Sequence, residues 1–260
     1  MNHSNHLEIH KAFTAQSAHF DSPAYHLSKQ EYADYLVRMT APAPEDDILE
    51  VAAGTFICGL DLATRARHVV CLDATPAMLE TGRRKSIKAD LRNMTFVKGY
   101  AEALPFLDDS FDIVISRLAF HHFTAAETPF EEMARVLRPG GKLVLVDMAP
   151  GDPALRTQVD DIERMRDNSH VRTLTQDEMA ALYTAHGLSL ARQETIDIPV
   201  ALEQWMDLTR TPDDARQGIR RIMEQDLASK TVSGFAPFRK DGELFFMHHC
   251  VYNIGIKGHK

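Results

Sequence analysis

Cysteine is scarce in this chain, whose 260 residues include only three, Cys58, Cys71 and Cys250. Three widely spaced cysteines supply neither the disulfide framework of a small secreted domain nor the close ligand spacing of a zinc site. The amino terminus, rich in His and Asn, lacks the basic end and apolar core of a signal peptide. We therefore expect a cytoplasmic protein without a resident metal.

Long apolar runs and an excess of basic residues are also missing. No stretch approaches the roughly 20 apolar residues that a membrane-spanning helix needs, so no membrane partner is expected. Lys and Arg number 29 against 37 Asp and Glu, which gives a formal net charge of −8. This balance argues against nucleic-acid binding, because neutralising phosphates requires clustered cations. We therefore expect a small molecule as the binding partner, and the sequence leaves open whether the protein forms a homodimer.

Short apolar runs alternate with helical patterns from residue 45 onward. Runs rich in Val, Ile, Leu or Phe, without polar alternation, predict buried strands at 47–52, 68–73, 94–98, 111–116 and 142–148. Helices are predicted between them at 57–66, 76–90 and 127–137. This order predicts an α/β, Rossmann-like fold with right-handed crossovers and helices on both faces of the sheet.

The pattern changes after residue 148. Further elements are predicted as helices at 152–167, 175–186 and within 201–230, and as strands at 188–198 and 244–256. A strand pair separated by an insertion indicates an antiparallel edge strand, which completes a mostly parallel sheet of seven strands. We expect a helical N-terminal arm at 1–44, a main domain at 45–260 with core motifs at 47–148, and a lid insertion at about 199–243.

The turn after the first strand carries small residues but no intact phosphate-binding motif. Where a dinucleotide-binding fold has Gly-x-Gly-x-x-Gly, this chain has Ala52, Gly54 and Ile57. The glycines at 54 and 59 have P-loop spacing, but Leu60 and Asp61 replace the lysine and hydroxyl residue of that motif. Both broken motifs favour a nucleoside without an adjoining pyrophosphate.

Several ordered motifs carry a resemblance to a known family. They are Glu50-Val51-Ala52-Ala53-Gly54-Thr55, Asp73 with the segment after it, and the stretches 99–106, 110–116 and 135–141. Together they resemble class I S-adenosylmethionine-dependent methyltransferases, in the branch that includes ubiquinone and menaquinone biosynthesis enzymes. The resemblance is close over residues 47–148 and loose in the flanks. It implies S-adenosylmethionine as cofactor, S-adenosylhomocysteine as product and a small-molecule methyl acceptor.

The resemblance also implies a cofactor site. Its expected residues are Glu50, Ala52, Ala53, Gly54, Asp73, Ala74, Met78, Tyr100, Ala101, Glu102, Ser116 and Arg117. Within this set Asp73 would accept hydrogen bonds from the ribose hydroxyls, as an acidic residue at the end of a second strand is placed to do. Met78 would lie against the adenine face, with Ala101 and Glu102 on the adenine edge. A helix N-cap role for Asp73 is the structural alternative.

Histidines after the fourth strand are the candidates for proton transfer. His121 is predicted as a general base, because strand ends in such sheets face the ligand and His titrates near neutral pH. A purely structural role stays open, since methyl transfer often needs only proximity. Residues expected at the acceptor or in a lid are Phe13, Tyr25, His122, Arg166, His170 and Trp205. Ordinary core packing and a salt-bridged loop are the alternatives for that set.

Two other functions stay open. A NAD-linked oxidoreductase on the same half-fold is disfavoured by the incomplete glycine motif. A regulatory or other non-catalytic protein of the same fold is motivated by Phe56, because its ring could fill the methionine end of the cofactor site.

Overall fold

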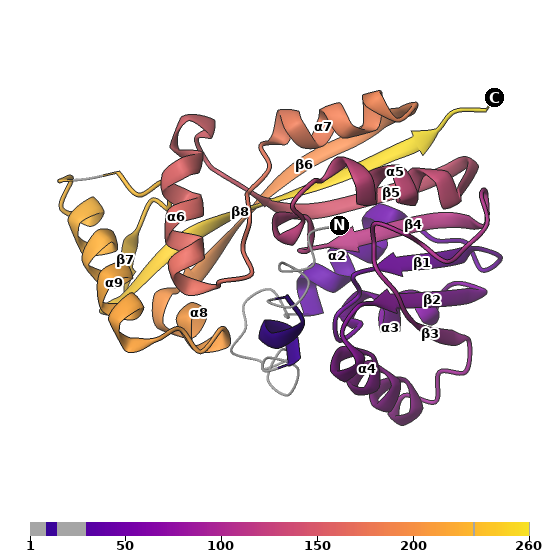
Figure 1. Ribbon diagram of the computed structural model, residues 1–260, viewed down its shortest axis with the longest axis horizontal. Helices are drawn as coiled ribbons and strands as arrows, with labels where there is room; N and C mark the ends of the chain where they lie inside the picture. The colour runs from indigo at the N-terminus through magenta and orange to yellow at the C-terminus, as the bar shows by residue number, and fades with distance from the viewer. Residues whose placement is uncertain (1–8, 15–29, 231, 260) are drawn as a thin grey trace.

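The computed structural model describes residues 9–14, 30–230 and 232–259. Its sheet has the strand order β3-β2-β1-β4-β5-β8-β6, with β7 paired to β8 (Figure 1). The strands are β1 Asp47–Val51, β2 His68–Asp73, β3 Met94–Lys98, β4 Phe111–Arg117, β5 Leu137–Ala149, β6 Leu188–Ala201, β7 Phe238–Lys240 and β8 Glu243–Lys257. The helices are α2 Gln30–Thr40, α3 Ile57–Ala63, α4 Pro76–Lys88, α5 Glu127–Val136, α6 Arg156–Arg166, α7 Gln176–Ala185, α8 Leu202–Leu208 and α9 Asp213–Leu227.

The first five strands pair in parallel, and β8 runs antiparallel to both β5 and β6. The predicted Rossmann-like, mostly parallel sheet with an antiparallel edge is therefore confirmed. The three-residue strand β7 was not predicted, because so short a segment carries no periodic pattern. The strand order changes direction beside β1, so the carboxyl ends of β1, β2 and β4 face one crevice.

Side chains of successive strand residues alternate between two apolar layers. Ile48 belongs to the layer beneath α2 and α3, whereas Leu49 belongs to the layer beneath α5 and α7. Both side chains are fully buried, because helices cover both faces of the sheet. The strands therefore read as continuous apolar runs in the sequence. This double cover holds the strand ends rigidly around the crevice.

The arm and the insertion take separate positions. Helix α2 packs against α3, and Lys142 Nζ closes its last turn by donating to the carbonyl oxygens of Thr40 and Ala41 at 2.8 and 3.0 Å. Helices α8 and α9, from the insertion, lie with α6 and β7 around the far end of the long β6–β8 pair (Figure 1). No helix within the described ranges is both long and apolar enough to cross a bilayer.

Candidate active site

A cavity opens at the carboxyl ends of β1, β2 and β4. It holds roughly 980 Å³ of space between atoms, including open solvent at its mouth. Most of the predicted cofactor residues line it: Glu50, Ala52, Ala53, Gly54, Asp73, Ala74, Tyr100, Ala101, Glu102 and Arg117. Phe13 and His122, predicted for the acceptor side, also line it. Residues far apart in the sequence thus form one wall.

The turn after β1 lines the cavity and contains several residues with positive φ. Ala52, Gly54 and Phe56 all have left-handed backbone conformations, with φ of 53°, 56° and 62°. Such φ values are ordinary for Gly and uncommon for other residues, so this turn stores strain at positions 52 and 56. Phe56 lies outside the lining of the cavity, fully buried with its ring 5.2 Å from that of Phe96. Its ring therefore leaves the methionine end of the expected site open.

Asp73, the last residue of β2, joins two turns. One carboxylate oxygen accepts from the Gly54 N–H at 2.8 Å and the other from the Thr75 N–H at 2.7 Å. Burial raises the pKa of Asp73, and these two N–H groups oppose that rise. Each oxygen keeps a further lone pair. Asp73 can therefore support the start of α4 and accept hydrogen bonds from a ligand in the cavity.

Glu50 and Arg117 bring an acidic and a basic side chain to the ends of β1 and β4. Burial raises the pKa of Glu50 to about 8, against the influence of the nearby Arg117 charge. The Oε2 atom of Glu50 is buried and has no hydrogen-bond partner among the described residues. This oxygen faces Gly59 of α3, since a Cβ atom added there would lie 2.5 Å from it, while the Glu50 side chain also lines the cavity.

His122 lines the cavity together with Phe13. Their rings meet edge to face, with centroids 5.1 Å apart. Nδ1 of His122 donates to the Ser169 carbonyl oxygen at 3.0 Å, so the lone pair of the neutral ring lies on Nε2. Burial, with a smaller effect of the His121 charge, holds the pKa of His122 well below its ordinary value. His122 is therefore a neutral imidazole at physiological pH.

His121 does not line the cavity, which corrects the prediction that it faces the ligand. It is buried against Asp147, whose carboxylate oxygens contact its Nδ1 at 2.7 Å and its backbone N–H at 3.2 Å. Adjacent side chains in a 3₁₀ turn such as 120–122 project about 120° apart, and one histidine of the pair lines the cavity. That residue is His122, and its ring centroid lies 4.1 Å from that of His121.

Sequence comparisons place these residues in a known family. A model described as a methyltransferase domain matches residues 49–145. The uncharacterized methyltransferase YcgJ of Bacillus subtilis strain 168 is 35% identical over 176 residues, which are 67% of this chain and 70% of that protein. The uncharacterized protein YafE of Escherichia coli K12 is 35% identical over 181 residues, 69% of this chain and 86% of that protein. The chain belongs to the methyltransferase family.

Further similarities agree with this class. The crystal structure of YcgJ superposes with a TM-score of 0.82 at 28% identity, covering 89% of this methyltransferase and 100% of that chain. The ubiquinone/menaquinone biosynthesis C-methyltransferase UbiE of Zymomonas mobilis is 31% identical over 118 residues, 45% of this chain and 49% of that protein. The predicted class I, S-adenosylmethionine-dependent methyltransferase is thus confirmed, and no observation favours the non-catalytic or oxidoreductase alternatives.

Two predicted cofactor residues of this methyltransferase lie away from the cavity lining. Met78 is fully buried on the same face of α4 as Gly82 and Ser86, and this spacing directs it into the protein core. Ser116 is also fully buried, paired in the sheet with Val51 and Leu145. For both positions the strand or helix register fixes a direction that the motif pattern alone does not reveal.

Three predicted substrate or lid residues, Trp205, Arg166 and His170, also lie away from the cavity lining. Trp205, in α8, is fully buried, with its ring 4.9 Å from that of Phe246 and with the Arg166 guanidinium over its face at 4.6 Å. His170 is buried and bonded to Asp160 at 2.9 Å. No described residue of the insertion at 199–243 lines the cavity, because α8 and α9 pack on α6 and the β6–β8 pair. Tyr25 lies outside the described residues.

Several lining residues of the methyltransferase were not predicted. They are Ile9, Thr55, Ile57, Cys58, Leu72, Thr75, Gly99, Leu118, Ala119 and Phe123. Most of them directly flank a strand end or a predicted site residue, so the rule that ligands bind beyond the carboxyl ends of strands could have found them. Ile9 lies in the N-terminal segment, which carries no family motif and gave no such signal.

Proposed function

We propose that this methyltransferase holds S-adenosylmethionine along the turn after β1 and methylates a small, largely apolar acceptor seated against His122 and Phe13. The observation that carries the proposal is the placement of two acidic side chains, the half-buried Asp73 and the buried Glu50, in one cavity beside the small residues 52–54. A nucleoside with an amino-acid tail offers hydroxyl donors at one end and an ammonium group at the other, which matches these two acceptors.

The residues of the cavity fit each part of that cofactor. Asp73 has lone pairs remaining for the ribose hydroxyls, in addition to its bonds to the backbone of Gly54 and Thr75. Glu50 lines the same cavity, and its ionised carboxylate would bind the ammonium group of the tail. Arg117 lines the same region and would pair with the carboxylate of the amino-acid tail.

The edge of the adenine ring would meet the segment that follows β3. Tyr100, Ala101 and Glu102 line the cavity there. Backbone groups at these positions can form hydrogen bonds with a purine edge, and the Tyr100 side chain can lie beside the ring. Met78 takes no part in this region because it is buried in the core.

The chemistry requires little beyond positioning. When bound, the cofactor supplies a methyl group on a positively charged sulfur. The acceptor nucleophile would attack the methyl carbon in line with the carbon–sulfur bond and displace the sulfur. The acceptor gains the methyl group and the sulfur keeps the electron pair of the broken bond, which leaves S-adenosylhomocysteine. Nε2 of His122 would accept the proton that the acceptor loses. Phe13, Leu118 and Phe123 would keep water from the reacting centre.

Binding of S-adenosylhomocysteine, measured by calorimetry, tests the proposal. We expect a dissociation constant in the micromolar range, and a loss of about 100-fold in affinity for Asp73→Ala, because two charge-assisted hydrogen bonds to ribose are removed. Leu107→Ala is the matched control, since Leu107 is exposed and lies outside the cavity lining. No heat of binding at millimolar ligand with folded protein would refute the proposal.

A further inference from the structure

The segment that would meet the adenine edge is short and is held at both ends. At its start, the Gly99 N–H donates to the Asp73 carbonyl oxygen at 3.1 Å. In its middle, the Ala103 N–H donates to the Tyr100 carbonyl oxygen at 3.2 Å, which closes a turn around Ala101 and Glu102. The cavity-lining residues of this segment therefore depend on what fixes the chain immediately after residue 103.

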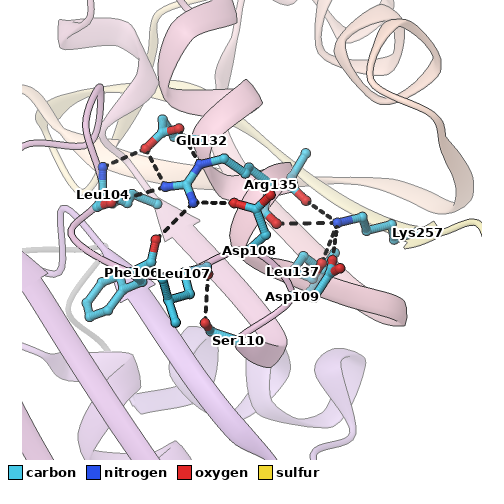
Figure 2. Close-up of polar contacts among 11 residues, drawn as sticks. Leu104, Phe106, Leu107, Asp108, Asp109, Ser110, Glu132, Arg135, Leu137 and Lys257 are labelled. Carbon is cyan, nitrogen blue, oxygen red and sulfur yellow. Dashed lines mark hydrogen bonds and ion pairs between the residues drawn. The ribbon is translucent and has the colours of Figure 1, made fainter.

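Two side chains of α5 fix that point, as Figure 2 shows. The Leu104 N–H donates to Glu132 Oε2 at 2.7 Å, and the Leu104 carbonyl oxygen accepts from an Arg135 Nη at 3.1 Å. Both polar groups of one residue's backbone are thus bound by a single Glu–Arg pair. A chain held in this way can neither rotate nor slide at residue 104 without breaking a charge-assisted hydrogen bond.

Arg135 also binds residues further along the segment (Figure 2). It donates to the Phe106 carbonyl oxygen at 2.9 Å and to Asp108 at 2.8 Å, while two other bonds of 2.6 and 2.8 Å join it to Glu132. The hydrogen bond from Arg135 lowers the pKa of Glu132, so the acceptor stays ionised. The planar guanidinium fork makes all these contacts at once, which a lysine ammonium cannot reproduce.

Lys257, near the end of β8, holds the last turn of α5 in place (Figure 2). Its Nζ donates to the carbonyl oxygens of Ala134 and Leu137 at 2.8 and 2.5 Å and contacts Asp109 at 2.8 Å. These bonds tie the helix that carries Glu132 and Arg135 to the edge of the sheet. Glu132 and Arg135 therefore project from a helix whose position is fixed.

We propose that Glu132 and Arg135 are positioning residues for purine recognition. They hold the backbone at 101–103 where it can form a hydrogen bond with the amino group of adenine. The inference rests on the proposed function, because it assumes that this segment meets the adenine edge. Neither side chain lines the cavity, so their effect on a ligand must pass through the segment they bind. A merely structural role would change stability and leave the choice between purines unchanged.

The test compares S-adenosylhomocysteine with S-inosylhomocysteine by calorimetry; the inosine ligand has an oxo group in place of the 6-amino group and a proton on the adjoining N1. A site that pairs with an amino group rejects the oxo analogue, and we expect the wild-type protein to prefer the adenine ligand by at least about 30-fold. In Arg135→Leu the preference should fall to about threefold or less. Arg135→Lys should recover only part of it, because the fork is lost.

Arg138→Leu is the matched control. Arg138 has similar exposure to Arg135, 36% against 30%, and its bonds go to Asp112 and the Asp109 carbonyl rather than to the segment 100–106. It should keep the wild-type preference. An unchanged preference in folded Arg135→Leu, checked by near-ultraviolet circular dichroism, would overturn the inference, as would a wild-type protein that binds both ligands equally. Failure of wild-type protein to bind either ligand would instead count against the proposed function.

Discussion

The ring of Phe56 occupies the space beside Gly82 so closely that a Cβ atom at position 82 would overlap it. Phe56 lies just before α3 and Gly82 lies in the middle of α4, so the contact joins these two helices. The bulky residue in the family's glycine-rich turn thus packs between helices and leaves the cavity clear. Its presence is compensated by the absence of a side chain at position 82.

This fit predicts strong coupling between the two positions. Gly82→Ala should lower the free energy of unfolding by about 3 kcal/mol, because the added methyl group must displace the ring. In the double variant Phe56→Ala/Gly82→Ala the loss should be smaller than the sum of the single losses, since the shortened side chain makes room. Urea denaturation measures each value. The control Gly218→Ala, in α9, should change stability little, because its Cβ would meet only the flexible end of Met165. If the loss of unfolding free energy in the double variant equalled the sum of the two single losses, the proposed packing of Phe56 against Gly82 would be contradicted.

The buried carboxyl group of Glu50 predicts a pH dependence of cofactor binding. Burial raises its pKa to about 8, so it is mostly protonated in the free protein at neutral pH. A ligand ammonium would bind the ionised form, and affinity should therefore rise about tenfold per pH unit as pH increases towards 8, then level off. Calorimetry with S-adenosylhomocysteine between pH 6 and 8 measures this slope. Glu50→Gln should bind more weakly at pH 8 and show a flat profile; a wild-type profile without slope would refute the assignment.

The sequence predicted those parts of the site that depend on strand ends. Asp73 and the 52–54 turn line the cavity, because apolar runs and the carboxylate that ends them locate the crevice edge. Met78 and Ser116 were misplaced, since which way a side chain points within an established helix or strand depends on packing partners that are distant in the sequence. Trp205 illustrates the same limit, because its burial depends on Phe246 and Arg166, which no local pattern connects to it.

The histidine that lines the cavity predicts where activity should be lost. Removing it in His122→Ala should lower kcat by about 100-fold or more if the acceptor must lose a proton, because general base catalysis contributes at least that much. His122 is buried, and its lowered pKa keeps it neutral, so wild-type kcat, measured with cofactor and acceptor at saturating concentration at each pH, should not fall as pH is lowered from 8 to 6. The measurement is a pH–rate profile with an accepted substrate. A midpoint near 6.5, or full activity in His122→Ala with unchanged binding of S-adenosylhomocysteine, would contradict this role.

The neighbouring histidine predicts an effect on stability. Burial alone would lower the pKa of His121, but the charge and hydrogen bond of Asp147 raise it above its ordinary 6.5. Burial would raise the pKa of Asp147, yet His121 and the Met148 N–H lower it below 3.8. The raised His121 contributes stability at low pH and loses it as pH rises through its folded pKa. The lowered Asp147 contributes stability at high pH and loses it as pH falls through its folded pKa.

The ion pair is therefore complete between about pH 4 and 6.5. Asp147→Asn should lower the free energy of unfolding by about 3 kcal/mol in that window, because it leaves a buried charge without its partner, and by less above the folded pKa of His121. Urea denaturation at pH 5.5 and pH 9 measures the difference. Asp197→Asn is the matched control, since the exposed Asp197 contacts His249 at 2.6 Å and should matter little. An equal loss at both pH values would show that Asp147 stabilises the fold through its hydrogen bonds to the backbone rather than through the charge of His121.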